Sequence, residues 1–228
     1  MIAWIAGAVL AVGGAVVAYL FWFAGGSGEA SAELTTPGLA STTPGAFDGK
    51  SFVIDQSQSS ASFEIQEVLQ GQPNIVAGAT DQVAGQVSVD LEDLSGAVFS
   101  DIVVNARTLR TDSERRDRAI RGPIILNSAS NEFELITLSV TSVDGLGGSA
   151  TVGATIEFTI TGDLTIKGTT DSVTFDVSVA LVDESTIEGS ATAHVTRSRF
   201  GIGIPNVPGV ADVAEEVVIN LDFVALAG

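Results

Sequence analysis

The basic side chains of this sequence are concentrated in one short stretch, although the chain as a whole is strongly acidic. Lys and Arg number 10 against 28 Asp and Glu, which gives a formal net charge of −18 at pH 7. Guanidinium groups form paired hydrogen bonds with carboxylates and phosphates. This stretch is therefore expected either to form salt bridges with nearby acidic side chains or to receive an anionic or polar head group. Its arginines are Arg107, Arg110, Arg115, Arg116, Arg118 and Arg121.

The other residue types that perform chemistry form no recognisable catalytic site. His194 is the only histidine, so a multi-histidine metal site is excluded and a Ser-His-Asp triad would depend on this residue alone. There is no cysteine, which excludes thiolate ligands, a cysteine nucleophile and disulfides. No G-x-S-x-G elbow or glycine-rich phosphate loop occurs. We predict a protein that is not an enzyme, needs no cofactor and binds no metal. A hydrolase centred on His194 is the less favoured alternative.

The excess of negative charge also argues against one class of partner. Binding to nucleic acid requires a basic face that meets the phosphates, and a net charge of −18 argues against such a partner. The charge instead indicates a surface that repels its own copies and anionic lipid head groups. A salt-adapted proteome is a second explanation for the same composition.

A long hairpin between residues 151 and 182 is the element that would position any site. Apolar and polar residues alternate from Val152 to Lys167, which predicts a strand with one buried and one wet face. Gly162 stands on the buried face, where glycine lets a strand bend or bulge. A turn is expected at 168–172, and the alternation then resumes. A long, bent, one-sided hairpin is typical of a sheet that curls into a barrel.

Similar alternation predicts an all-β fold of about eight antiparallel strands, closed as a barrel, with a sandwich as the alternative. An insert at 108–131 interrupts the pattern. Thr111 and Glu114 fit a capping box, and Pro123 would end the short helix that follows. The other strands are expected at 52–55, 60–68, 83–91, 97–107, 133–143, 188–196 and 216–225.

The inward face of these strands supplies the candidates for a binding lumen. An eight-stranded barrel has an interior that side chains fill or that holds one small ligand. Both outcomes stay open, because large inward residues alternate with small ones such as Ala191. The candidate lumen residues are Phe63, Ile65, Val87, Val104, Phe158, Ile160, Leu164, Phe175, Val177 and Phe223.

The N-terminal part of the chain predicts a membrane anchor followed by a linker. Residues 2–24 contain no charged side chain, and a run of this length can span a bilayer as one helix. A cleaved signal peptide ending near Ala30-Ser31-Ala32 is the alternative. Residues 25–47 are rich in Gly, Ser, Thr and Pro and are expected to form a flexible linker. We therefore predict an anchor at 1–24, a linker at 25–47 and a β domain at 48–228, placed on the extracytoplasmic side.

Two segments resemble the motifs of a known family. Residues 162–170 read GDLTIKGTT, and residues 197–202 read RSRFGI. With the Ile-Asp pair at 54–55 and the Arg-rich segment at 116–121, they make the chain similar to the YceI-like family over roughly 52–224. The resemblance implies a lipocalin-like β-barrel that binds polyisoprenoid or other lipids outside the cytoplasm.

The chain departs from this family pattern at several positions. Gln56 and Gln58 stand where the family often has Pro and His, and Ala119 replaces a usual His. No metal or head-group role attached to those histidines is therefore carried over.

The leading hypothesis is a membrane-tethered extracytoplasmic protein that holds an isoprenoid or similar lipid in an apolar lumen. The lipid would be its ligand, and the membrane a partner through the N-terminal helix. The alternative is a non-catalytic extracellular structural or interaction module with a filled core. The head-group candidates are Arg107, Arg116, Arg121 and Arg197.

Overall fold

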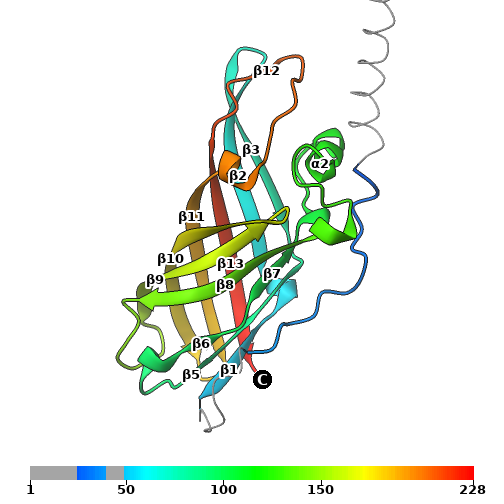
Figure 1. The fold of residues 1–228 in the computed structure, drawn as a ribbon. Coiled ribbons are helices and arrows are strands. Elements are labelled where there is room, and N and C mark those ends of the chain that lie inside the picture. The colour runs from blue at the N-terminus through cyan, green and yellow to red at the C-terminus, as the bar shows by residue number, and fades with distance from the viewer. Residues whose placement is uncertain (1–24, 40–48) are drawn as a thin grey trace, which may run out of the picture.

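The fold consists of antiparallel β-strands with one short α-helix beside them (Figure 1). A computed structural model of the 228-residue chain describes residues 25–39 and 49–228. The all-β class and the short helical insert are confirmed. The predicted membrane anchor at 1–24 lies outside the described residues. Among the described residues, no helix has the length and apolar character needed to span a membrane.

The strands differ widely in length, and five single-turn 3₁₀ helices separate some of them in the described part of the chain. The strands are β1 (Lys50–Ile54), β2 (Ser60–Leu69), β3 (Gln72–Thr80), β4 (Val83–Ala84), β5 (Gln86–Val89), β6 (Val98–Phe99), β7 (Ile102–Asn105), β8 (Leu135–Asp144), β9 (Thr155–Ile166), β10 (Thr169–Asp183), β11 (Thr186–Thr196), β12 (Val210–Ala211) and β13 (Glu216–Ala227). The helices are η1 (Gln56–Gln58), η2 (Leu94–Gly96), η3 (Ala106–Thr108), α2 (Glu114–Arg121), η4 (Asn131–Phe133) and η5 (Arg197–Phe200).

The strands pair in a series that curls back toward its start. The order is β7, β8, β9, β10, β11 and β13, and β13 then pairs with β1 and β2, which lie end to end on either side of η1. The strands β3, β4 and β5 follow one another within residues 72–89. Of these, β3 pairs with β2, and β5 pairs with β1. The same stretch pairs with β6 and β7 through β5 and β4. The result is a curled, barrel-like sheet (Figure 1).

The hairpin of β9 and β10 follows the predicted alternation, but its turn lies earlier than expected. Ile166 pairs directly with Thr169, so the turn consists of Lys167 and Gly168 alone. Both turn residues have positive φ, 51° and 75°. Two such residues form the tight turn that matches the twist of an antiparallel pair. The expected turn at 168–172 is therefore wrong, and most of those residues belong to β10.

Gly162 lies opposite a bulge, as predicted for a bend, but the irregular strand is its neighbour. β9 pairs with β10 without interruption, whereas the register of β8 shifts between Val140 and Ser142, opposite Gly162. A Cβ at Gly162 would lie 2.7 Å from Leu138 Cδ1 and 2.7 Å from the carbonyl oxygen of Ser139. Glycine is required here because β8 approaches so closely.

The helix α2 forms in the insert, but with a different N-terminus from the one predicted. Its N-cap side chain makes no capping hydrogen bond. The backbone N and Oγ1 of Thr111 instead both donate to Asp117 Oδ1, at 2.8 and 2.7 Å. The expected capping box between Thr111 and Glu114 is therefore wrong, because the acidic partner comes from one turn further along. The helix ends before Pro123, as predicted.

Residues 25–39, which we call the strap, run extended along the outside of the sheet (Figure 1). At one end the carbonyl of Gly25 accepts a hydrogen bond of 2.7 Å from Arg121 Nε of α2. In the middle Leu34 is buried in a small apolar cluster, and at the far end Leu39 bridges to the segment between β6 and β7. The described part of the predicted linker thus has defined partners on the sheet. The boundaries of the three predicted regions stay predictions.

Candidate functional site

An apolar cavity of about 500 Å³ occupies the interior of the curled sheet. Its volume falls within the range of about 300–1,000 Å³ that is typical of small-molecule sites. The structure places all ten candidate lumen residues in its wall, while their contact with a lipid stays a prediction. These residues are Phe63, Ile65, Val87, Val104, Phe158, Ile160, Leu164, Phe175, Val177 and Phe223.

The wall of the cavity is built from two separate apolar clusters. One includes Phe175 and Phe200, and the other includes Phe52 and Leu181. Small side chains such as Ala191 complete the wall and leave space between the larger ones. The cavity exists because the inward face of the sheet mixes large and small apolar residues.

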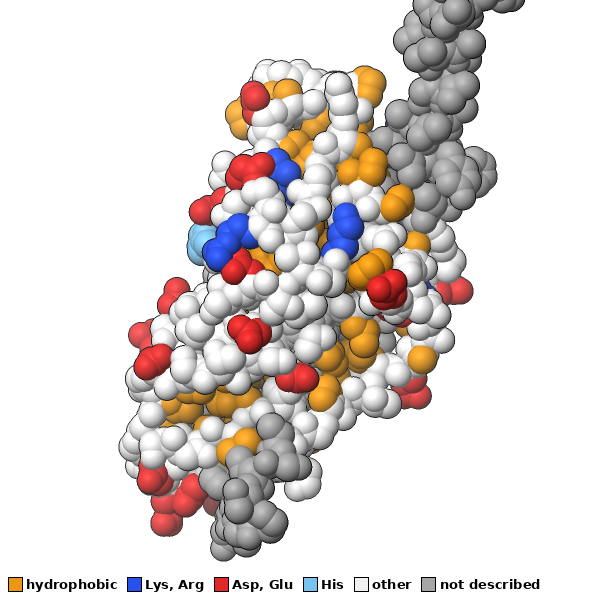
Figure 2. Space-filling view, in the orientation of Figure 1, with side chains coloured by type: hydrophobic (Ala, Val, Ile, Leu, Met, Phe, Trp, Pro, Cys, Tyr) orange, Lys and Arg blue, Asp and Glu red, His pale blue; other side chains and the backbone are white. Residues whose placement is uncertain are grey.

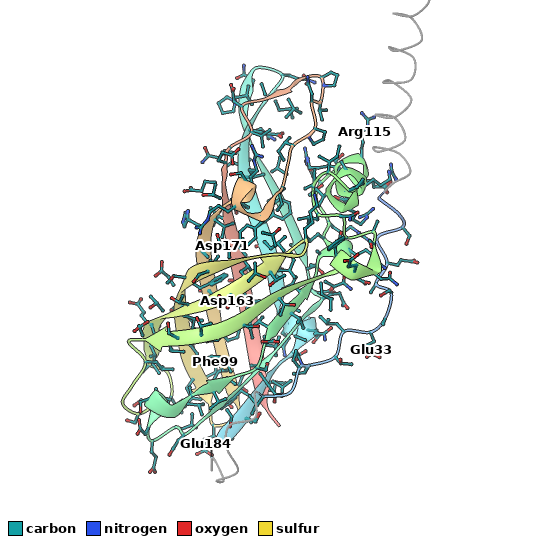
Figure 3. All side chains as sticks on the ribbon, viewed as in Figure 1. Glu33, Phe99, Arg115, Asp163, Asp171 and Glu184 are labelled. Atoms are coloured by element: carbon teal, nitrogen blue, oxygen red, sulfur yellow. The ribbon has the colours of Figure 1, made fainter. Side chains whose placement is uncertain are left out.

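Charged side chains line the cavity at the end where α2 and η5 lie (Figure 1). Arg115 and Arg116 come from the start of α2, and Figure 3 labels Arg115 at that end. Arg197 begins η5, and Glu67 comes from the inward face of β2, where it accepts a hydrogen bond of 3.0 Å from Asn74 Nδ2. An apolar wall with a few charged groups at one end suits a ligand with an apolar chain and a polar head.

The structure does not bring the other two head-group candidates, Arg107 and Arg121, to the cavity. Arg107 is buried, pairs with Glu134 at 3.2 Å and donates through Nε to the carbonyl of Ser128 at 2.7 Å. Arg121 is buried beneath the strap and donates to the carbonyl of Gly25. Both side chains hold the insert and the strap in place.

Glu134 is the acceptor at the centre of the buried network around Arg107. Asn105 Nδ2 donates to its Oε1 at 2.9 Å, and the backbone N of Ser31 donates to the same oxygen at 2.8 Å. Burial raises the pKa of Glu134, but the hydrogen bonds from Ser31 and Asn105 and the charge of Arg107 outweigh it. The pKa therefore lies below its usual value, and the ionised carboxylate ties the strap to the sheet.

Arg197 fastens residues 201–215, which we call the clasp loop. Its Nε donates to the carbonyl of Ala214 at 2.9 Å, and its Nη1 donates to that of Ile202 at 3.1 Å. Its Nη2 forms a salt bridge with Oε1 of Glu215 at 2.5 Å. One guanidinium thus holds both ends of the loop. The loop side chains that line the cavity are Ile202, Ile204, Pro205, Val207, Val210 and Val213.

Sequence reasoning missed the clasp loop and Glu67 as parts of the site. The loop lacks period-2 alternation, and its available signal was a density of Ile, Val and Pro after the RSRFG segment. Glu67 shares the parity of Phe63 and Ile65 in β2, which signalled an inward carboxylate.

His194 points outward from β11, where its Nδ1 lies 3.3 Å from Glu216 Oε1 and its side chain is 61% exposed. This position fits an ordinary strand residue. Within residues 25–39 and 49–228, no group of three His, Cys, Asp or Glu side chains is placed to hold a metal ion. The absence of catalysis stays a prediction.

Solved structures share this fold. BcnA of Burkholderia cenocepacia gives a TM-score of 0.59 at 21% identity, and the match covers 75% of this chain and 98% of that one. A structure described as a polyisoprenoid binding domain from Saccharophagus degradans, implicated in plant cell wall breakdown, gives 0.60 at 11% identity and covers 78% and 98%. At these identities the likeness shows the fold alone.

Sequence relatives extend across the same region. A UPF0312 protein of Staphylococcus aureus (strain USA300) is 28% identical over 157 residues, which are 66% of this chain and 81% of that protein. The family described as YceI-like domain matches residues 52–225, which contain most of β1 and β13 and every strand between them. The motifs at 162–170 and 197–202 both fall inside this match. The chain therefore belongs to the YceI-like domain family.

Proposed function

We propose that this protein binds an isoprenoid or similar lipid inside the curled sheet. The observation that carries the proposal is the cavity of about 500 Å³, whose apolar wall ends at Arg115, Arg116 and Arg197. An apolar chain buried there gains about 25 cal/mol for each Å² removed from water. Arg115 and Arg116 would contact the polar head of the same molecule, whereas the guanidinium of Arg197 is already held by the clasp loop.

The comparisons support a lipid as the ligand class. One structural neighbour is described as a polyisoprenoid binding domain. The cavity offers the apolar surface that such a ligand needs. The alternative, a structural module with a filled core, requires side chains in the space that the cavity occupies. We therefore favour a binding protein without catalytic activity.

The proposal includes a membrane tether and an extracytoplasmic location. Residues 2–24 form an uncharged run of 23 residues, and about 20 apolar residues suffice for a membrane helix. The first basic residue after this run is Lys50, so the orientation is supported by the acidic residues Glu29 and Glu33 and by the size of the domain that follows.

A substitution that fills the cavity with a large side chain tests whether lipid binds there. Ala191 lines the cavity, and Ala191→Trp would place an indole in the space of the ligand. The full chain, purified in detergent, would be titrated with farnesol and extracted to identify any lipid retained from the cells. We expect Ala191→Trp to weaken farnesol binding by at least about tenfold, a loss of about 1.4 kcal/mol.

The matched control is Ala180→Trp. Ala180 lies on the neighbouring strand β10 but outside the cavity wall, so the same substitution should leave farnesol binding unchanged. Equal binding by both variants, or no binding by the unmodified chain, would overturn the proposed function.

A further inference from the structure

We propose that the uncharged end of the molecule docks on a lipid bilayer, so that ligand passes directly between the membrane and the cavity. The uncharged end is defined as residues 68–80 of the β2–β3 hairpin together with residues 200–211, which include β12. The inference rests on the proposed lipid-binding function and adds a docking surface and an orientation to it.

The uncharged end is set apart by its lack of Asp, Glu, Lys and Arg. Neither of its two segments contains such a residue, although the whole chain has 38, the sum of 10 basic and 28 acidic residues. The segments adjoin, because Val210 pairs with Leu69 and the backbone N of Gln70 donates to the carbonyl of Gly209 at 2.6 Å. Ile75 is 61% exposed on this hairpin. Because Glu67 pairs with Asn74 and Asp212 follows the second segment directly, only the outermost part of this end meets a bilayer without the cost of removing charges from water.

The cavity extends to this end. Val76 of the hairpin and Val207 and Val210 of the clasp loop belong to its wall. Figure 2 shows hydrophobic side chains on the surface of the same upper region. The cavity wall therefore reaches the proposed docking surface at the same end as the charged side chains that line the cavity.

The opposite end of the molecule is acidic. The loops there carry Asp90, Glu92, Asp93, Asp183 and Glu184. Figure 3 labels Glu184 at the far end of the sheet from Arg115, and Figure 2 shows Asp and Glu side chains around this lower end. An anionic lipid surface repels this end, so the charge distribution favours one orientation.

The strap joins the uncharged N-terminal run to the same half of the molecule. Gly25 follows that run directly and is fixed on α2 by its hydrogen bond with Arg121. The backbones also touch, because a Cβ at Gly25 would lie 2.1 Å from the carbonyl oxygen of Arg118. No free length of chain therefore separates a membrane anchor ending at residue 24 from α2. The anchor would hold α2 at the membrane surface.

The helix α2 connects the strap with the cavity. Arg116, Ala119 and Ile120 line the cavity, whereas Arg118 and Arg121 contact the strap. The cavity and the start of the strap thus contact different residues of the same helix. An anchor that holds α2 at the membrane surface would also hold the cavity close to the bilayer.

A bilayer fits the uncharged end better than a second copy of the chain does. A net charge of −18 makes two copies repel each other. The chain that precedes the strap is apolar over residues 2–24, which matches hydrocarbon. A second copy is retained as an outcome of the test.

Single cysteines provide the test, because the chain contains none of its own. Ile75→Cys and Val182→Cys would each be labelled with an environment-sensitive dye in the full chain, reconstituted in phosphatidylcholine vesicles with a minor fraction of phosphatidylglycerol. Ile75 is 61% exposed at the uncharged end, and Val182 is 45% exposed beside the acidic Asp183. We expect nitroxide lipids to quench the dye at 75 and aqueous iodide to quench the dye at 182.

Equal iodide quenching at both positions, or a chain that does not float with the vesicles, would overturn the docking surface. Protection at position 75 that depends on protein concentration and not on nitroxide lipid would assign the surface to a second copy instead. Farnesol binding in detergent is measured on the same samples. If binding persists while docking fails, the proposed lipid-binding function stands and only this inference falls.

A charge at the docking surface tests the transfer of ligand. Ile75→Asp should slow farnesol transfer from vesicles to the cavity by about tenfold or more, because a buried carboxylate opposes docking. Its affinity for farnesol in detergent should not change. Val182→Asp serves as the matched control and should transfer farnesol at the unmodified rate. Equal transfer rates in the two variants would contradict the proposed route.

Discussion

At the scale of single residues, Gly162 sets how closely two strands of the cavity wall approach. Gly162→Ala would place a Cβ 2.7 Å from the carbonyl oxygen of Ser139, which cannot move without disturbing the pairing of β8 with β9. We expect the free energy of unfolding to fall by about 1–3 kcal/mol, the usual cost of overpacking. Urea denaturation measures this change. Gly147→Ala, which has open space at its Cβ, should shift stability by less than about 0.5 kcal/mol, and equal losses would contradict the explanation.

Arg197 is a second residue with a specific geometric task. Arg197→Lys keeps the charge but cannot bridge the carbonyls of Ala214 and Ile202 at the same time. Each hydrogen bond from a charged group contributes about 1.5–3 kcal/mol. We therefore expect amide hydrogen exchange in the clasp loop to accelerate by about tenfold or more. Arg199→Lys, at an exposed arginine that pairs with Asp171, is the control and should leave this exchange rate unchanged.

The direction of the strand side chains could be predicted from the sequence, because parity alone decides it. All ten predicted lumen residues lie in the cavity wall for this reason. The partners of the arginine side chains could not be predicted in the same way. Arg107 and Arg121 bind Glu134 and the carbonyl of Gly25, and these partners are distant in the sequence. Only the folded chain shows which guanidinium groups are already occupied.

At the scale of elements, the strap depends on the ionised state of Glu134. Because the pKa of Glu134 in the folded chain lies below its usual value of 4.5, the network is fully stabilising above about that pH. The stabilisation is lost as the pH falls through the lower pKa of the folded state. We expect a spin label at the exposed position Ala32→Cys to become mobile on acidification below about pH 4.5, as measured by electron paramagnetic resonance.

A neutral side chain separates this effect from general acid unfolding. In Glu134→Gln the same label should be mobile at every pH, because the amide cannot pair with Arg107. Glu157→Gln, at an exposed position of β9, should keep the mobility change of the unmodified chain. If the mobility of the label follows the same pH curve in all three proteins, protonation of Glu134 is not what releases the strap.

Elements with strong periodicity were predictable, whereas those fixed by backbone groups were not. The long strands β9, β10 and β13 follow alternation that is plain in the sequence. The tight turn at Lys167 and Gly168 was missed because lysine seldom adopts positive φ. The strap has no periodicity and is held largely through its own carbonyls, such as those of Gly25 and Gly28. Any sequence possesses such carbonyls, so no residue type signals the contact.

At the scale of the whole molecule, the presence of a cavity was the feature that the sequence left open. Whether a barrel interior is filled depends on the summed volumes of side chains from many strands, here from β1 to β13. The alternation of residues along a strand predicts which side chains point inward, but it does not predict how completely they fill the interior.

Net charge is the other property of the whole molecule with a measurable consequence. A charge of −18 destabilises the folded state through self-repulsion, and this repulsion is screened over about 30 Å at 0.01 M salt and about 10 Å at 0.1 M. The same salt also screens partly exposed ion pairs such as Arg118 with Glu114, but pairs near the surface are worth only about 0–1 kcal/mol each. With 28 acidic against 10 basic residues, we expect the repulsion to be the larger effect and salt to stabilise this protein.

We therefore expect the thermal midpoint of the full chain in uncharged detergent to rise as sodium chloride increases from about 0.01 to 0.1 M and beyond. Each gain of about 1 kcal/mol corresponds to about 2–4 °C for a chain of this size. Glu92→Gln combined with Glu184→Gln removes two charges from the acidic end and should raise the midpoint at low salt while shrinking its salt dependence. A midpoint that falls with salt would mean that attractive ion pairs, and not the excess of acidic residues, dominate the electrostatics of the fold.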